Sequence, residues 1–148
     1  MPSVADTGRR DSSGTRGQKY SWVLTTGTSR DDLVDAMRKR HSYGATDNIV
    51  LDFRLEADGR EYLAGDEIPA ARDYKLKVNV IGTGSIRRID VIHNESYAWE
   101  TAPAGQRTAS FTYVDSHPSP GENRQYVRVE QEDGNMAWSS PVWVGRSR

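Results

Sequence analysis

The chain has 148 residues, of which 35% are hydrophobic, and a formal net charge of −1 at pH 7. This length is enough for one ordinary domain, and so small a net charge gives no electrostatic argument for binding nucleic acid or an anionic membrane. Because the sequence contains no cysteine, disulfides, thiolate catalysis and cysteine-type zinc sites are excluded.

The first 19 residues, MPSVADTGRRDSSGTRGQK, are polar and rich in Gly, Ser, Thr and Arg. We expect residues 1–19 to form a flexible N-terminal arm, because almost nothing in them can be buried. They lack the apolar region of a signal peptide, and no later run approaches the roughly 20 apolar residues of a membrane span. These patterns predict a soluble, cytoplasmic protein.

The next segment, residues 20–47, has the pattern of one strand followed by one helix. The stretch YSWVLTT alternates as a short strand does. Ser29 is a suitable N-cap, and Asp32 stands where an acidic side chain completes a capping box. Apolar residues then recur at helical spacing, and basic residues follow at the C-terminal end, where the helix dipole favours them. The sequence predicts an amphipathic helix from about Arg30 to Arg40.

After Gly44 the hydrophobic period becomes that of strands. Alternating segments such as NIVLDFRLE, YKLKVNVIG and QYVRVEQE follow one another, divided by Gly, Asp and Pro, which is typical of an antiparallel sandwich. We therefore predict a mainly β fold: an immunoglobulin-like antiparallel β-sandwich domain over residues 48–148, with about seven or eight strands, preceded by the short strand and the helix. The side chains predicted to face the core are Ile49, Leu51, Phe53, Leu55, Tyr74, Leu76, Val78, Val80, Val127 and Val129.

Several turn signals divide these strands. Asp58-Gly59 and Asp133-Gly134 predict turns. The stretch GTGS at Gly82 predicts a hairpin turn and not a phosphate loop, because a strand and not a helix follows it. The adjacent Arg87-Arg88 breaks strict alternation, as a β-bulge does, and Pro141 predicts an edge or bulge position.

No pattern of catalytic or metal-binding residues stands out. His41, His93 and His117 are far apart, with no pair at metal-ligand spacing, and we interpret each as solvated or capping. No serine lies in a GxSxG motif. The acidic residues interpreted as a solvated face are Asp52, Glu56, Glu130 and Glu132. The sequence thus assigns no catalytic residue and no metal ligand.

The tryptophans allow two interpretations. Trp22, Trp99, Trp138 and Trp143 lie in predicted strands, where aromatic side chains most often pack in a core. A sugar-binding platform would instead require two or three rings exposed on one face. We predict packing for these side chains.

Four segments in order, LVDAMRKRHSYGATDNIVLDFRL, YLAGDEI, KLKVNVIGTGSIRRIDVIHN and YVRVEQEDGNMAWSSPVWV, resemble the C-terminal region of metal-dependent hydrolases of the PHP (polymerase and histidinol phosphatase) superfamily. The closest pattern is that of an uncharacterised subgroup with an appended β-sandwich. The resemblance covers about Tyr20 to Val144. It implies that residues 20–47 correspond to the strand and helix that close a PHP barrel, and that residues 48–148 are the appended sandwich.

The resemblance also has an implication for activity. PHP enzymes hold two or three metal ions with histidines and carboxylates on barrel strands that precede this region, and such ions activate water and clamp an oxyanion. The last Asp-His ligand motif of the family would fall within residues 5–14, where this chain has Asp6 and Asp11 but no histidine. The resemblance therefore implies a non-catalytic C-terminal accessory or remnant domain, with a divalent metal only if a barrel is supplied in trans.

Two alternatives remain open from the sequence. One is a β-sandwich that binds a carbohydrate or a protein partner. The other is half of a split metal-dependent phosphoesterase completed in trans. In that case Trp22, Leu24, Leu33 and Met37 lack the barrel that the family packs on them, and they form a candidate interface for a homodimer or a PHP-barrel partner.

Overall fold

The computed structural model describes residues 19–71, 73–116 and 118–145, and it consists mainly of antiparallel strands with one helix. The prediction of a mainly β fold with one helix is confirmed, whereas the predicted arm lies outside the described residues except for Lys19. The elements in chain order are β1 (Tyr20–Val23), α1 (Arg30–Arg38), β2 (Ser42–Ala45), β3 (Val50–Ala57), β4 (Arg60–Leu63), β5 (Glu67–Ile68), β6 (Tyr74–Ile81), β7 (Ile86–His93), β8 (Ser96–Thr101), β9 (Thr108–Asp115), β10 (Asn123–Gln131), β11 (Met136–Ser139) and β12 (Val142–Val144).

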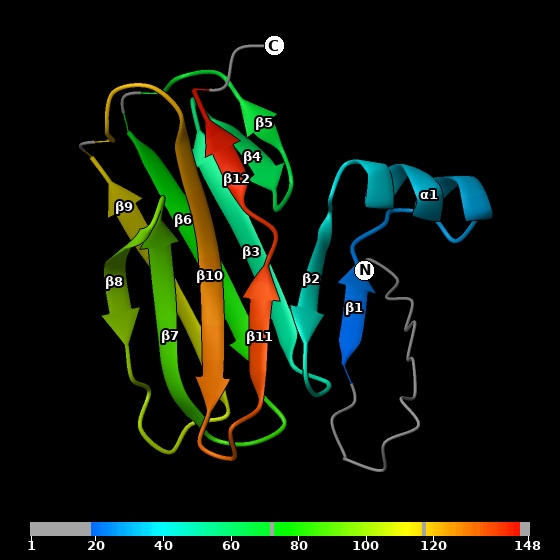
Figure 1. The fold of residues 1–148 in the computed structure, drawn as a ribbon, viewed down its shortest axis with the longest axis vertical. Coiled ribbons are helices and arrows are strands. Elements are labelled where there is room, and N and C mark those ends of the chain that lie inside the picture. Colours follow the sequence, from blue (N-terminus) through cyan, green and yellow to red (C-terminus); the bar gives the residue numbers. More distant parts are fainter. Residues whose placement is uncertain (1–18, 72, 117, 146–148) are drawn as a thin grey trace.

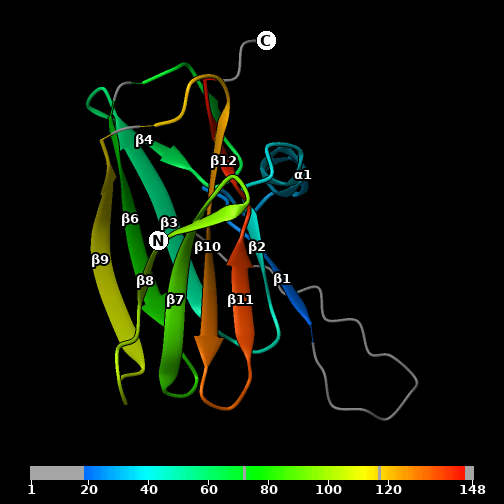
Figure 2. The same ribbon diagram turned by 60° about the vertical axis from the view of Figure 1, so that its left-hand side comes forward.

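The strands form two sheets that lie in separate layers, seen face-on in Figure 1 and more nearly from the side in Figure 2. The first sheet has eight strands in the order β1-β2-β11-β10-β12-β5, with β7 paired to the other side of β10 and β8 paired to β7. The second has four strands in the order β4-β3-β6-β9. The pairings are antiparallel, except that β12 runs parallel to β5.

Alternating side chains of both sheets meet in one hydrophobic core, as they do in a β-sandwich. Leu55 of β3 and Leu76 of β6 face Val127 and Val129 of β10, and all four side chains are 0% exposed. The ten side chains predicted to face the core are all buried. Each buried aliphatic side chain contributes about 1.5–3 kcal/mol relative to an exposed one, so this alternation determines which face of each strand is inside.

Most predicted turns are confirmed. Asp58 and Gly59 have φ of 50° and 72° in the β3–β4 hairpin, which is the double positive φ of a type I′ turn. Gly134 has φ of 83° in the β10–β11 hairpin. The register between β7 and β10 shifts so that Arg87 is the extra residue, which confirms the bulge at this arginine pair.

The hairpin predicted at Gly82 is wrong. The strands on either side of it, β6 and β7, lie in different sheets, so this turn crosses from one layer to the other. Its conformation depends on a distant side chain: the buried amide of Gln131, in β10, accepts hydrogen bonds from the backbone amides of Thr83 and Gly84 at 2.9 and 3.2 Å. A local glycine pattern cannot distinguish this crossover from a hairpin.

Pro141 lies between two short strands. Both β11 and β12 pair with β10, over Arg128–Glu130 and Asn123–Gln125 respectively, and Pro141 separates them. The single closing strand expected here is therefore broken in two, because proline cannot donate to a ladder.

The strand–helix segment 20–47 is continuous with the first sheet. Strand β2 pairs with β1 on one side and with β11 on the other, so the sheet crosses the boundary predicted at residue 47. Helix α1 lies to one side of the sandwich, beyond the end of β1 and the start of β2 (Figures 1 and 2), and the residues after it approach Gly65 in the loop between β4 and β5. In the described part of the chain, no helix has the length and apolar character needed to cross a membrane.

Candidate functional site

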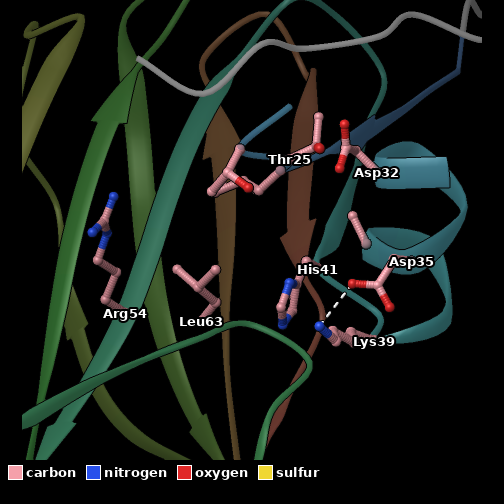
Figure 3. A pocket seen from close by; sticks show the side chains of 10 residues that line it. Thr25, Asp32, Asp35, Lys39, His41, Arg54 and Leu63 are labelled. Atoms are coloured by element: carbon pink, nitrogen blue, oxygen red, sulfur yellow. Dashed lines mark ion pairs between the residues drawn. The ribbon is translucent and has the colours of Figure 1, made fainter. Parts of the chain in front are cut away.

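A pocket of about 510 Å³ opens between α1 and the outer side of β3 and β4. Figure 3 shows Asp35, Lys39 and His41 on the helix side of this pocket and Arg54 and Leu63 on the sheet side. The lining residues are Leu24, Thr25, Thr26, Asp32, Asp35, Ala36, Lys39, His41, Arg54 and Leu63. Because it combines charged and apolar side chains, this pocket is the candidate functional site.

Asp32 closes the start of the helix. The Ser29 hydroxyl accepts a hydrogen bond from the Asp32 amide at 3.1 Å, and the Asp32 carboxylate accepts one from the Ser29 amide at 3.2 Å. This reciprocal pair is the predicted capping box, which satisfies backbone groups that the first turn leaves unpaired. The hydrogen bond from the Ser29 side chain lowers the pKa of Asp32 below its ordinary value. Asp32 therefore stabilises the helix.

The helix ends two residues earlier than predicted, at Arg38, in a Schellman motif. The His41 amide donates to the Ala36 carbonyl at 3.0 Å, and the Arg40 amide donates to the Met37 carbonyl at 3.0 Å. Arg40 takes the left-handed conformation that this motif requires, with φ of 60°. Two residues of the predicted helix thus belong to its cap.

The side chain of Arg40 is held by the body of the protein. Its guanidinium donates to the Gly65 carbonyl at 3.2 Å and to Glu67 at 2.6 Å, and it lies 4.6 Å from the centre of the Trp143 ring. These contacts offset the cost of a left-handed conformation at a residue other than glycine.

The backbone at the end of α1 packs directly against Gly65. Its φ is 102°, and a Cβ atom at this position would overlap the carbonyl oxygens of Lys39 and Arg40. The Gly65 amide donates to the Pro141 carbonyl at 2.9 Å, which ties this loop to the β11–β12 connection. The end of the helix, the β4–β5 loop and the first sheet therefore meet at one glycine.

The other ionisable side chains of the pocket also have partners, and Arg54 pairs with Asp52 and Glu61 on its own side of the pocket. Lys39 and Asp35 form an ion pair at 2.7 Å along the helix surface, and the hydrogen bond to Asp35 raises the pKa of Lys39 (Figure 3). His41 Nε2 lies 2.8 Å from Asp66 Oδ1, and the other oxygen of Asp66 accepts a hydrogen bond from the Leu63 amide at 2.8 Å. His41 thereby fastens the segment after the helix to the β4–β5 turn.

A second polar cluster lies inside the protein, between the two sheets. The Tyr74 hydroxyl donates to Asp115 at 2.9 Å and accepts from the Gln125 amide at 2.7 Å. His93 Nε2 lies 2.6 Å from Asn123 Oδ1, and its Nδ1 lies 3.5 Å from Asp115. Burial raises the pKa of Tyr74 well above its ordinary value. A buried, interconnected network of this kind fixes the alignment of the strands it joins.

The sequence did not predict either His–Asp contact or this cluster. A signal for the cluster was nevertheless present in β10, where Asn123 and Gln125 occupy inward positions of the alternation. A polar side chain on an inward position requires a buried partner, although the alternation does not identify that partner.

The histidines lie in different parts of the structure. His41 and His93 each contact their own acidic residue, in the pocket and in the cluster, and His117 lies outside the described residues. Asp6 and Asp11 also lie outside them. Within the described ranges, no group of three or more histidines and acids could hold a metal ion.

Of the acids interpreted as a solvated face, Asp52, Glu56 and Glu130 lie on the outer sides of strands, and Glu132 is exposed in the turn after β10. Asp52 accepts from Arg54 at 3.0 Å, and Glu56 pairs with Lys77 at 2.5 Å across β3 and β6. Glu130 pairs with Arg87 at 3.3 Å. Pairs exposed in this way are worth little individually, and they keep the outer faces charged.

The four residues of the candidate interface do not form one exposed patch. Trp22 and Leu24 pack against the main core, and the Trp22 ring stacks on Tyr43 at 6.0 Å between centroids. Leu33 is half-buried, whereas Met37 is 56% exposed. Trp22, Leu24 and Leu33 are thus at least partly covered by this chain itself.

The other tryptophans differ in exposure. The Trp99 ring is half-buried and packs on Phe111 at 4.5 Å and Tyr113 at 6.4 Å, so it bridges the adjacent edges of the two sheets without being fully covered. Trp138 is 38% exposed on the outer face of the first sheet, where it lies over Gly44 of the neighbouring strand. The packing prediction is wrong for Trp138, because its position in the alternation points away from the core.

This chain is similar in sequence to part of several longer bacterial proteins. It is 31% identical over 148 residues to an uncharacterised protein of Chlamydia trachomatis, a match that covers 86% of this chain and 23% of that protein. It is 30% identical to an uncharacterised protein of Chlamydia muridarum, with the same two coverages. The chain therefore spans less than a quarter of the length of these curated relatives. Neither a protein-family model nor a solved structure matches it.

Proposed function

We propose that this chain is a non-catalytic accessory β-sandwich of immunoglobulin-like type, related to the domain appended to PHP-type metal-dependent hydrolases. It acts as a structural module of a larger protein assembly. Any metal ions would be bound by a PHP barrel supplied in trans. The four-segment resemblance motivates the relation, and the greater length of the bacterial relatives supports a modular role.

One observation carries the proposal: the ionisable groups of the pocket have structural partners. Asp32 caps the helix, Lys39 pairs with Asp35, and His41 contacts Asp66. The first two contacts lie within the helix segment, whereas the contact of His41 with Asp66, the hydrogen bond of Arg40 to the Gly65 carbonyl and the close approach at Gly65 join the end of α1 to the sandwich. The polar groups of the pocket therefore stabilise the helix itself and its junction with the sandwich.

A hydrolysis assay tests the proposal. The purified chain is incubated with p-nitrophenyl phosphate and Mn²⁺, Zn²⁺ or Fe²⁺, and we expect no turnover above the rate of the metal alone. Metal-dependent turnover that is retained when Asp6 and Asp11 are both changed to alanine, but lost in His41→Asn or His93→Asn, would place a catalytic centre in this chain and refute the proposal. The folded state of each variant is checked by circular dichroism.

A second candidate function is that of a binding module for a carbohydrate or a protein. The observation that favours it is the exposed aromatic pair on the outer face of the first sheet, where Trp138 is 38% and Tyr97 61% exposed. Arg128 lies beside Trp138 in the register and 5.4 Å from the Tyr97 ring. A glycan array tests it: binding that is lost in Trp138→Ala and kept in Trp99→Phe would favour this function over an accessory role.

A split phosphoesterase remains the third proposal, with a PHP barrel or a second copy covering the helix. Of the four residues of the candidate interface, Met37 is the exposed one, so the surface left for a partner is smaller than the sequence suggested. Restoration of metal-dependent hydrolysis by an added barrel protein, and its loss in Met37→Glu, would support it.

A further inference from the structure

The edge of the second sheet formed by β9 is long and open. Strand β9 pairs with β6 over its full length, and on its other side it pairs with no strand of the described chain (Figure 2). Its first seven residues, TASFTYV, include no charge, proline or glycine. An open edge of this kind is a template for another strand, and proteins usually protect against it.

The other edges of the two sheets carry such protection. Strand β4 has 4 residues, among them Arg60 and Glu61. Strand β8 contains Glu100 and has a register irregularity opposite Val91 and Ile92. Strand β1 also has 4 residues. Short length, charge and irregularity are the devices that discourage pairing. Strand β9 has 8 residues in regular register, and its one charged residue, Asp115, is buried at its end.

The hydrogen-bonding phase of β9 can be derived from its neighbour. The Gly82 amide donates to the Arg107 carbonyl at 2.6 Å, directly beyond the pair Ile81–Thr108. Because an antiparallel ladder alternates, the odd-numbered residues of β9 direct their backbone groups to β6 and the even-numbered ones direct them outward. The outward residues are Thr108, Ser110, Thr112 and Val114, and all four are exposed.

The core is incomplete along this edge. Phe111 and Tyr113 point to the core face of β9, yet both are only half-buried, as is Trp99 that packs on them. The inward side chains of the central strands β3 and β6 are, in contrast, almost completely buried. An added strand would cover the aromatic side chains as well as satisfy the backbone groups.

We propose that β9 pairs antiparallel with β9 of a second copy of this chain, so that two four-stranded sheets join into one across a two-fold axis at Phe111. In this register Phe111 faces Phe111 across the axis and Ala109 faces Tyr113. The other opposing pairs are Arg107 with Asp115, Thr108 with Val114, and Ser110 with Thr112. No like charges oppose one another, since Arg107 and Asp115 differ in sign and Asp115 is already bound by Tyr74 within its own chain. The four outward residues of each strand become the hydrogen-bonded pairs.

Sedimentation velocity of Thr112→Pro and Thr112→Val tests the pairing. Proline removes an amide that points away from β6, so the monomer keeps its own ladder, while valine keeps the amide. We expect the wild type and Thr112→Val to dimerise, and the dimer dissociation constant of Thr112→Pro to rise at least about tenfold, because two hydrogen bonds are lost per dimer. A wild type that is monomeric at its highest soluble concentration, or a dimer that the proline leaves intact, would overturn the proposal.

Disulfide trapping tests the register without relying on the proline variant. The chain has no cysteine of its own, and Ser110 of one copy would face Thr112 of the other at about 5.5 Å between Cα atoms, within the range of a disulfide. A mixture of Ser110→Cys and Thr112→Cys should form the mixed dimer on oxidation much faster than either variant alone dimerises. Equal rates for the mixture and for each single variant would contradict the register centred on Phe111.

Discussion

The two edges of the second sheet are finished in opposite ways. At the β4 edge the strand is short and charged, and the end of α1 is seated on the following loop at Gly65. At the β9 edge the strand has 8 residues, with outward backbone groups and half-buried aromatic side chains. One edge is thus closed by this chain itself, whereas the other leaves room for a strand from outside. The difference shows that the helix completes the sandwich on one side only.

The largest expected effect comes from disturbing the closed edge at its seat. Gly65→Ala would force a Cβ atom into the carbonyl oxygens of Lys39 and Arg40 at a φ of 102°, so we expect a loss of about 3 kcal/mol in the free energy of unfolding. Urea denaturation measures it. Gly59→Ala is the matched control, since Gly59 also has positive φ but no atom within 4 Å of the added Cβ, and it should cost about 1 kcal/mol. Equal costs at the two glycines would mean that the helix is not seated on Gly65.

The next effect concerns pH. Burial raises the pKa of Tyr43 to about 12, and its hydroxyl donates to the Ile49 carbonyl at 3.0 Å. The folded state therefore favours the neutral phenol, and this contribution is complete below the ordinary tyrosine pKa of about 10 and is lost as the pH rises toward 12. We expect Tyr43→Phe to cost about 1 kcal/mol at pH 7. Between about pH 10 and pH 12, the unfolding free energy of the Tyr43→Phe variant should fall by about 2 kcal/mol less than that of the wild type. Parallel curves of stability against pH would contradict this expectation.

A smaller effect is expected at the start of the helix. Ser29→Ala removes the hydroxyl that accepts from the Asp32 amide, which should cost about 1 kcal/mol in urea denaturation. Ser29→Asn should recover most of it, because asparagine is also a good N-cap. Hydrogen exchange should show faster opening of α1 and unchanged protection at β9. Equal losses in both elements would contradict the independence of the two edges.

The smallest effect is expected at the exposed face of the helix. Met37→Glu should change the unfolding free energy by less than about 0.5 kcal/mol, because the side chain is 56% exposed. It should also leave the dimer dissociation constant unchanged, in contrast to Thr112→Pro. A dimer weakened by Met37→Glu in sedimentation velocity would move the association from β9 to the helix, where the sequence alone had suggested it.

Local patterns predicted the helix start, the core-facing side chains and most of the turns. Ser29 and Asp32 form the capping box within one helical turn, and the glycine after Asp58 sets its hairpin without help from distant residues. Prediction failed where a distant partner decides the outcome. The turn at Gly82 becomes a crossover held by Gln131. Trp138 is a different case, because the local alternation of β11 already places it on the outer face.

The candidate site shows the same division. Lys39 and Asp35 are four residues apart, so their contact on a helix surface follows from the sequence. His41 and Asp66 are 25 residues apart in the sequence. Tyr74 is 41 residues from Asp115 and 51 from Gln125. No spacing rule brings such residues together, because their distance depends on how the sheets stack.

The sequence by itself determined the mainly β class, the single helix and its cap, and the face that each core strand turns inward, since period and capping act between near neighbours. The tertiary structure alone decided that the helix end packs on Gly65, that His41 contacts Asp66, and that β9 is left at an open edge. Those features arise from which strands end up at the edges of a sheet, and edge position is a property of the assembled fold rather than of any segment within it.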